Sequence, residues 1–246
     1  MLPKFVLEVA ATGDELRKRG TSALMRGRFI TFEGGEGTGK SVQASLLANR
    51  LRGLGLSVVL TREPGGSPGA EIIRHVILSG AAKPFGAPAE AILFAAARDD
   101  HIRHTIQPAL ERGRWVISDR FADSTRVYQG TLGNVDPKLI QGLERITVGD
   151  LKPDITFILD VPTEVGLARA QARRGDEAAD RFERESVEFH DKLRDAFRLL
   201  ARSEPDRCVL IDASAASATV AERVWKVITE RLDPATAPIA LGDVAS

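Results

Sequence analysis

The sequence has only one cysteine, Cys208, and no excess of either charge among its 246 residues. One cysteine cannot form a disulfide within the chain, so a fold held together by internal bridges is excluded. The 34 basic and 34 acidic residues balance, which argues against a nucleic-acid-coating protein or a polybasic membrane anchor, because both need a basic excess. A local basic pocket for a small phosphorylated ligand is compatible with this balance.

Long apolar runs are missing as well. No stretch approaches the ~20 apolar residues that a membrane-spanning helix needs. The apolar start of the chain, residues 5–10, contains Glu8 and is soon followed by Asp14 and Glu15, which is untypical of a secretory signal. We therefore expect a cytoplasmic protein with no membrane partner and no nucleic-acid partner.

Apolar, often β-branched runs alternate with segments of helical apolar spacing through the middle of the chain. The runs predicted to be strands are 29–33, 57–61, 115–119, 155–160 and 207–212. The segments predicted to be helices are 41–54, 89–110 (with a break before Pro108), 137–146, 164–174, 183–203 and 219–232. Such alternation predicts an α/β fold with a five-stranded parallel sheet and helices on both faces.

One domain, residues 28–232, holds all of these segments. Residues 1–27 differ from it, with a short apolar opening and a basic cluster at 17–19, and we expect a mobile extension or a helix on the domain surface. Residues 233–246 are rich in Ala and Pro and are expected to form a loose tail. The purpose of the extension stays open.

A glycine-rich loop joins the first predicted strand to the first predicted helix. Its sequence fits G-x-x-x-x-G-K-[ST], in the strand–loop–helix context of a phosphate-binding loop. Backbone N–H groups of such a loop hold a polyphosphate, while Lys40 would supply positive charge and Ser41 a ligand for Mg²⁺. This alone leaves a kinase, a switch GTPase and a motor open. The residues expected to bind the nucleoside triphosphate are Gly34, Gly35, Glu36, Gly37, Thr38, Gly39, Lys40 and Ser41.

Charged residues end the next two strands, at the sheet edge where ligands gather in such folds. Arg62 precedes an irregular Glu-Pro-Gly-Gly turn and could grip a phosphate with two hydrogen bonds, or simply lie exposed on that turn. Asp119 and Arg120 could hold Mg²⁺ and a second phosphate, or form a local ion pair without a catalytic task.

Two helical segments carry further candidates. Phe94 and Arg98 lie four residues apart, hence on one helix face, where they could stack on a base and bond its edge; a core Phe and a solvated Arg are the alternative. Arg169, Arg173 and Arg174 lie near Gly175 and could belong to a mobile lid that stabilises a transferring phosphoryl group, or to a solvated helix end.

The order and spacing of these motifs resemble the thymidylate kinase family, from about Arg28 to about Asp212. The motifs that carry the resemblance are Glu33–Ser41, Arg62–Gly66, Leu93–Arg98, Asp119–Phe121, Ser124-Thr125, Tyr128–Gly130, Lys152–Asp154, Leu159–Val161 and Gly166–Gly175. The resemblance implies a P-loop NTPase fold, phosphorylation of dTMP to dTDP by ATP with Mg²⁺, and a homodimer, for which the helix 89–107 is the expected interface.

The resemblance also implies roles for single residues. Glu36 would contact the sugar 3′-hydroxyl, Arg62 and Arg120 would hold the acceptor phosphate, and Gln129 would lie near it. Phe94 would stack on thymine, Arg98 would bond a base carbonyl, Ser124 and Thr125 would lie at the pyrimidine edge, and Tyr128 would lie under the sugar.

Because Gly37 stands where one branch of the family has an arginine, the lid would supply the arginine that meets the transferring phosphate. The predicted catalytic residues are Lys40, Glu36, Arg120, Arg169, Arg173 and Arg174, with Ser41 and Asp119 at the metal.

Three rivals stay open at this point. Another nucleotide or deoxynucleoside kinase is disfavoured by the turn after Arg62 together with the segment at Tyr128. A GTPase switch is disfavoured because the chain has no Asn-Lys-x-Asp motif. An inactive ATP-binding module is disfavoured by the presence of Lys40, Ser41 and Asp119.

Overall fold

The computed structural model describes residues 26–175, 182 and 184–235. Most of the predicted extension and tail therefore lie outside the described residues, as does most of the chain between the predicted lid helix and residue 184. Within the described ranges, no helix combines the length and the apolar character needed to cross a bilayer.

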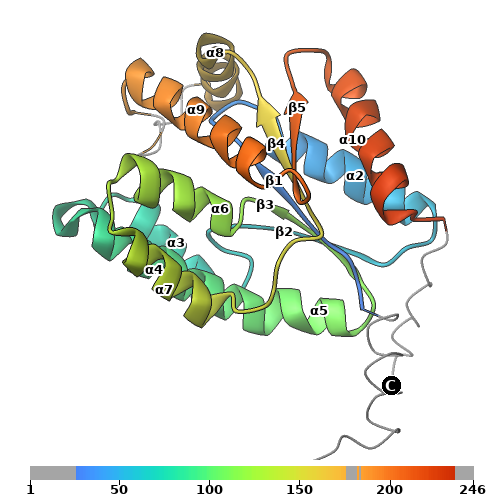
Figure 1. The fold of residues 1–246 in the computed structure, drawn as a ribbon, viewed down its shortest axis with the longest axis horizontal. Coiled ribbons are helices and arrows are strands. Elements are labelled where there is room, and N and C mark those ends of the chain that lie inside the picture. Colours follow the sequence, from blue (N-terminus) through green and yellow to red (C-terminus); the bar gives the residue numbers. More distant parts are fainter. Residues whose placement is uncertain (1–25, 176–181, 183, 236–246) are drawn as a thin grey trace, which may run out of the picture.

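Five parallel strands form one sheet in the order β2-β3-β1-β4-β5 (Figure 1). They are β1 (Phe29–Glu33), β2 (Val58–Arg62), β3 (Trp115–Asp119), β4 (Ile155–Asp160) and β5 (Cys208–Asp212). Each begins and ends within one residue of its predicted range, so the predicted sheet is confirmed. The central strands are buried on both faces, which explains their continuous apolar sequences.

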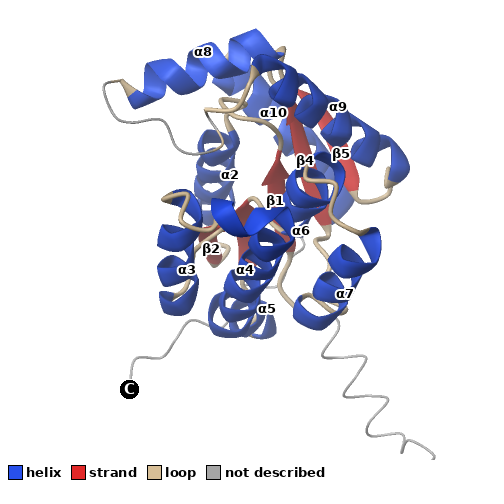
Figure 2. Cartoon of the chain, turned by 90° about the vertical axis from the view of Figure 1, so that its left-hand side faces the viewer, coloured by secondary structure: helices blue, strands red, loops and turns tan. Residues whose placement is uncertain are grey.

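Helices cover both faces of this sheet, as predicted. They are α2 (Lys40–Gly53), α3 (Pro68–Leu78), α4 (Gly86–His101), α5 (Gln107–Glu111), α6 (Ala122–Thr125), α7 (Pro137–Thr147), α8 (Thr163–Arg174), α9 (Val187–Ser203) and α10 (Ser217–Leu232). One apolar core joins α2 and α10 to one face, and separate cores join α5 and α9 to the other. Figure 2 shows α4 and α6 in front of the strands and α10 behind them.

Two helical details refine the prediction. The predicted helix 89–110 is interrupted by a π-helical turn, Ile102–Ile106, before α5 begins; the break agrees with Pro108, which has no N–H to continue the helical ladder. Helix α3 was not predicted. Its start is nevertheless encoded, since Ser67 precedes it and Pro68 occupies its first turn, where a proline fits best.

Strand register brings the predicted site residues to one edge. Arg62 pairs with Asp119, and Asp119 also pairs with Phe32, one residue before the end of β1. The phosphate-binding loop leaves β1 at the same edge, directly after Glu33. Because all five strands run in the same direction, their carboxyl ends build one continuous surface for a ligand.

Candidate active site

The phosphate-binding loop packs against the backbone of α8. Gly37 has a φ of 66°, and a Cβ there would lie 1.8 Å from the carbonyl oxygen of Gly166. A Cβ on Gly166 would in turn lie 2.6 Å from the carbonyl oxygen of Glu36. Position 37 therefore has no room for a side chain unless α8 moves; that an arginine comes from the lid segment stays a prediction.

Lys40 begins α2 and points back into the loop. Its Nζ donates to the carbonyl oxygen of Gly35 at 2.6 Å and to Oγ1 of Thr38 at 3.4 Å. Burial, with the neighbouring positive charge of Arg120, lowers the pKa of Lys40 to about 8. A polyphosphate beside Nζ would favour the charged form, so the loop holds a cation that gains from an anionic ligand.

Ser41 and Asp119 are in direct contact across the site. The Ser41 hydroxyl donates to Oδ2 of Asp119, which joins the first turn of α2 to the end of β3. A hydroxyl and a carboxylate are hard oxygen donors of the kind that Mg²⁺ prefers. The pair fits a magnesium ion at the phosphates, as the sequence predicts.

Glu36 and Arg120 form the charged centre of the site. Oε1 of Glu36 accepts from Nη2 of Arg120 at 2.6 Å and from the hydroxyl of Tyr128 at 3.0 Å. Burial raises the pKa of Glu36, but Arg120, Lys40 and the Tyr128 hydroxyl outweigh it and bring that pKa down to about 2. Glu36 is therefore ionised at neutral pH and is too weak a base to take a proton there.

Arg120 occupies an unusual backbone conformation, with a φ of 72°. A non-glycine residue in the left-handed region costs ~1 kcal/mol or more. The side chain is held by Glu36, by the carbonyl oxygen of Gly34 at 3.2 Å and by Oγ of Ser124 at 3.3 Å. Its guanidinium also lies 5.3 Å from the ring centre of Tyr128.

A cavity of about 300 Å³ opens beside this centre, and we call it the acceptor cavity. The predicted residues that line it are Glu36, Gly37, Gly39, Lys40, Ser41, Arg62, Phe94, Asp119, Arg120, Ser124, Thr125, Tyr128, Gln129 and Arg173. Gly34, Gly35 and Thr38 lie on the other side of the loop, toward β4 and α8. The volume lies at the low end for small-molecule sites.

The two ends of the acceptor cavity differ in chemistry. Arg62 extends from the end of β2, where its guanidinium donates to Glu71 at 2.9 Å while half of the side chain stays exposed. Aromatic rings gather elsewhere: Phe182 lies 6.4 Å from Phe94 and 5.2 Å from Tyr128 between ring centres. The cavity can thus accept an anion and a flat apolar group together.

Arg98 does not line the acceptor cavity. Its side chain is 4% exposed, and Nε donates to Glu63 at 2.8 Å while Nη2 donates to Oγ1 of Thr125 at 2.9 Å. His101 contacts the other oxygen of Glu63 at 3.1 Å. The structure therefore places Arg98 behind Thr125, whereas a direct bond to a base carbonyl stays a prediction.

The three predicted lid arginines on α8 differ in their surroundings. Arg173 lines the acceptor cavity. Arg169 instead donates to the carbonyl oxygens of Ala213 at 2.9 Å and Ser214 at 3.1 Å, just after β5. Arg174 does not line the acceptor cavity. Of the three, Arg173 is the one that the structure brings to the cavity.

Six residues of the cavity wall were not predicted as site residues: Val42, Glu63, Pro64, Arg74, Leu78 and Phe182. Arg74 and Leu78 come from α3, the helix that was not predicted, and Phe182 comes from beyond the lid helix. Nη1 of Arg74 donates to the carbonyl oxygen of Pro64 at 2.5 Å. Helical spacing after Ser67-Pro68 was the signal that could have found Arg74 and Leu78.

The fold and this site define the class of the protein. A phosphate-binding loop after the central strand of a parallel sheet, beside a cavity lined by Arg62, Arg120 and Arg173, is the arrangement of a P-loop phosphotransferase. The model of the family described as thymidylate kinase matches residues 32–224. The chain belongs to the thymidylate kinase family.

Individual relatives agree with the family model. A protein named thymidylate kinase from Nitrobacter winogradskyi is 65% identical over 206 residues, covering 84% of this chain and 90% of the relative. One from a Bradyrhizobium species (strain ORS 278) is 60% identical over 224 residues, covering 91% and 98%. The crystal structure of thymidylate kinase from Ehrlichia chaffeensis matches with a TM-score of 0.67 and 34% identity, over 82% of this chain and 99% of that one.

The predicted family, fold and enzyme class are thus confirmed. The comparisons give no support to another nucleotide kinase or to a GTPase switch.

Proposed function

We propose that this phosphotransferase binds ATP with Mg²⁺ and transfers the γ-phosphoryl group to a phosphate oxygen of dTMP, which forms dTDP. The acceptor cavity carries the proposal, because it joins the phosphate-binding loop to an anion-binding end and an aromatic end. A nucleoside monophosphate has the matching pair of groups.

The donor would lie on the loop that ends in Lys40 and Ser41. Lys40 would neutralise charge on the transferring phosphate, and Ser41 with Asp119 would hold Mg²⁺, which offsets the charge of the polyphosphate. Arg62 and Arg120 would hold the acceptor phosphate, with Gln129 near it. Such a reaction has a loose transition state, so positioning and electrostatics carry most of the catalysis.

Glu36 would position the acceptor and not abstract a proton. A phosphate oxygen is already a competent nucleophile, and the low pKa of Glu36 keeps it ionised. Its carboxylate would accept from the sugar 3′-hydroxyl, while Tyr128 would lie under the sugar and disfavour a 2′-hydroxyl. Removal of the negative charge should therefore weaken binding of acceptors that carry the 3′-hydroxyl.

The aromatic end would select the base. Phe94 would stack on thymine, with Ser124 and Thr125 near the pyrimidine edge and Arg98 acting through a bond to the base or through Thr125. Because dUMP lacks only a methyl group, which is worth about 1 kcal/mol of buried surface, discrimination against it should be modest.

We also infer that Arg173 is the lid arginine nearest the transfer, with Arg169 and Arg174 supporting the segment. Closure of that segment over the cavity would exclude water, which otherwise competes as acceptor. Arg173 lies on α8 at the cavity wall.

A homodimer in the cytoplasm is the expected form of the enzyme. Helices α3 and α4 pack on each other and expose Ile72 and Ile92, which are 68% and 50% accessible. Ile92→Glu should shift the sedimentation coefficient toward a monomer, while Ile146→Glu, at a position 75% accessible on α7, should not. Equal behaviour of both variants would count against α4 as the interface.

The test of the reaction is an assay of ADP release with MgATP and one acceptor at a time: dTMP, dUMP, dCMP, dGMP, thymidine or none. A rate that strongly favours dTMP supports the proposal. Preference for another acceptor would keep the phosphate-binding loop but overturn the base-site roles. A rate that no acceptor stimulates would contradict phosphoryl transfer to nucleotides.

A further inference from the structure

The helical segment that follows Arg120 is short. Arg120 and Ser124 line the acceptor cavity, whereas Asp123, between them in sequence, lines a separate cavity of about 220 Å³. Helix α6 has four residues and continues directly into a seven-residue π-helical stretch, Arg126–Leu132, and a helical segment of this length is marginal on its own. Contacts from other elements must therefore fix its orientation.

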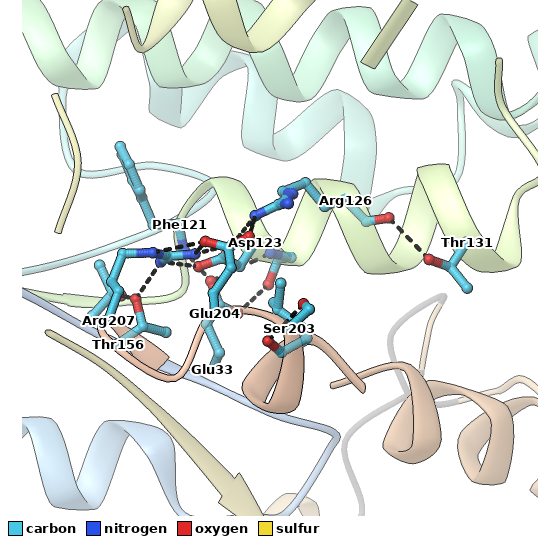
Figure 3. Close-up of polar contacts among 12 residues, drawn as sticks. Glu33, Phe121, Asp123, Arg126, Thr131, Thr156, Ser203, Glu204 and Arg207 are labelled. Carbon is cyan, nitrogen blue, oxygen red and sulfur yellow. Dashed lines mark hydrogen bonds and ion pairs between the residues drawn. The ribbon is translucent and has the colours of Figure 1, made fainter. Parts of the chain in front are cut away.

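Asp123 is held by a two-pronged ion pair from a distant part of the chain. Arg207, directly before β5, donates from Nη1 to Oδ2 of Asp123 at 2.6 Å and from Nη2 to Oδ1 at 3.0 Å (Figure 3). The side chains are 4% and 16% exposed for Asp123 and Arg207. Two parallel bonds of this kind fix direction as well as distance.

The guanidinium of Arg207 is itself anchored to the sheet. Nη1 also donates to Oγ1 of Thr156 on β4 at 2.7 Å, and that hydroxyl lies 2.8 Å from the hydroxyl of Thr31 on β1. The carbonyl oxygen of Arg207 accepts from the N–H of Thr156 at 3.0 Å. Through these bonds, Arg207 fixes the orientation of Asp123 relative to the central strands β1 and β4.

Glu204 and Arg126 join Asp123 and Arg207 in one charged group, which we call the Asp123 cluster. Glu204 accepts from Nη2 of Arg207 at 2.8 Å, and Arg126 bridges Glu204 at 2.7 Å and Asp123 at 3.1 Å. Two acids and two arginines thus balance. Buried ion pairs contribute little net stability but fix geometry where both charges are compensated.

On the other flank, Glu33 accepts from both the N–H and the hydroxyl of Ser124, at 3.3 and 2.7 Å, and from the N–H of Phe121 at 2.7 Å. Glu33 ends β1 directly before the phosphate-binding loop. Strand β1 and the start of β5 therefore clamp α6 from two sides.

We propose that Arg207 and Asp123 are positioning residues for phosphoryl transfer, which hold the start of α6 so that Arg120, just before it, faces the phosphate of the acceptor nucleotide. The inference rests on the proposed function of the acceptor cavity. Neither residue lines that cavity, and Thr125 keeps a separate hydrogen bond from Arg98, so we expect the effect mainly on binding of the phosphate and little effect on the base or on ATP.

The test uses a variant in which both charges disappear together, D123N/R207M, because a single substitution would leave the cluster with one uncompensated charge and threaten folding. Calorimetry would measure binding of dTMP, thymidine and ATP, with urea unfolding to establish that the variant is folded. Arg207→Lys retains the charge but not the two parallel bonds, and should give an intermediate effect. Arg50→Met is the control, since Arg50 pairs with the exposed Glu222 between α2 and α10.

We expect the double variant to bind dTMP about tenfold more weakly, the loss expected from a misaligned bond to a charged group. Thymidine, which has no phosphate, and ATP should bind within about twofold of the wild type. Unchanged dTMP affinity in a folded double variant would overturn the proposal, as would equal weakening of dTMP and thymidine. Failure of the wild type to bind dTMP would instead contradict the proposed function.

Discussion

Glu33 and Glu36 lie three residues apart in the sequence, yet their pKa values are shifted in opposite directions. Glu33 is completely buried and faces the Asp123 cluster. Burial and the charge of Asp123 raise the pKa of Glu33 to about 7. Glu36 faces Arg120 and Lys40, which bring its pKa down to about 2.

The difference follows from what each side chain contacts. Both are removed from water, which by itself raises the pKa of a carboxyl group. Glu33 receives neutral donors from Phe121 and Ser124, whereas Glu36 receives a guanidinium at 2.6 Å. The end of β1 thus carries a carboxyl that holds Phe121 and Ser124 in place, and the loop after it carries a carboxyl whose negative charge faces the acceptor cavity.

The largest effect should come from Lys40→Ala, which removes the cation between the donor phosphates and Glu36. We expect turnover to fall by at least ~10²-fold, as when one donor to developing charge is lost. Steady-state ADP release with MgATP and dTMP measures this. Lys226→Ala, on the exposed face of α10, is the control, and near-normal turnover of Lys40→Ala would contradict the assignment of the loop.

Glu36→Gln should remove the difference in charge between positions 33 and 36, because glutamine is neutral. We expect dTMP affinity to fall ~10- to 100-fold, since a hydrogen bond to a charged group contributes about 1.5–3 kcal/mol. Calorimetric titration with dTMP and with 3′-deoxythymidine monophosphate measures the loss. The 3′-deoxy acceptor should lose less affinity than dTMP, only what the weaker bond between position 36 and Arg120 costs, and an equal loss for the two acceptors would contradict the role at the 3′-hydroxyl.

Phe94→Ala changes the aromatic part of the cavity lining and neither of the two carboxyls. Loss of base stacking should weaken dTMP roughly tenfold, because stacking of a base on an aromatic ring contributes about 1–3 kcal/mol. ATP affinity should change little, and fluorescence or calorimetric titrations of both nucleotides measure this. Phe85→Ala, at a position 74% exposed, serves as the control; comparable weakening of ATP and dTMP would rule out a role confined to the base.

Glu33→Gln should affect stability more than activity. A glutamine retains the geometry, because its oxygen accepts from the two N–H groups and its nitrogen donates to the Ser124 hydroxyl. Folded Glu33 binds a proton between pH 4.5 and about 7, where the unfolded chain does not. Wild-type stability should therefore fall as pH rises through this window.

The glutamine variant lacks that loss. Between pH 5 and pH 8 the wild type should lose on the order of 2 kcal/mol more free energy of unfolding than the variant. Urea unfolding at both pH values measures the difference, and parallel curves for the two proteins would contradict the raised pKa. Glu111→Gln, on an exposed helix end, controls for the general effect of pH.

Local patterns in the sequence predicted much of the fold and the site. Apolar runs predicted the five strands, and the spacing of the glycines predicted the phosphate-binding loop. Gly34, Gly37 and Gly39 have positive φ angles there, which glycine adopts readily. Because parallel strands share one carboxyl edge, the meeting of Asp119 with Ser41 also followed from the order of motifs.

Such local patterns could not predict contacts between segments that are distant in the sequence. The sequence offered Arg98 as a base contact, but the structure pairs it with Glu63, 35 residues earlier. Helix α3, and with it Arg74, was missed because the Pro-Gly-Gly turn before it suggested an irregular loop. Phe182 lies at the cavity through ring contacts with Phe94 and Tyr128, which come from distant parts of the chain.

The sequence by itself determined the strand–loop–helix chemistry of phosphate binding, since that chemistry depends on neighbours along the backbone. Only the tertiary structure decided that the pKa of Glu33 is raised and that Glu36 is surrounded by Arg120 and Lys40, which lower its pKa. Asp123 and Arg207 are 84 residues apart, and Glu36 and Arg120 are also 84 apart, so only the packed sheet brings each pair together. Charge interactions fall off with distance and depend on burial, which is why the fold, and not the residue types, sets the two opposite pKa values of Glu33 and Glu36.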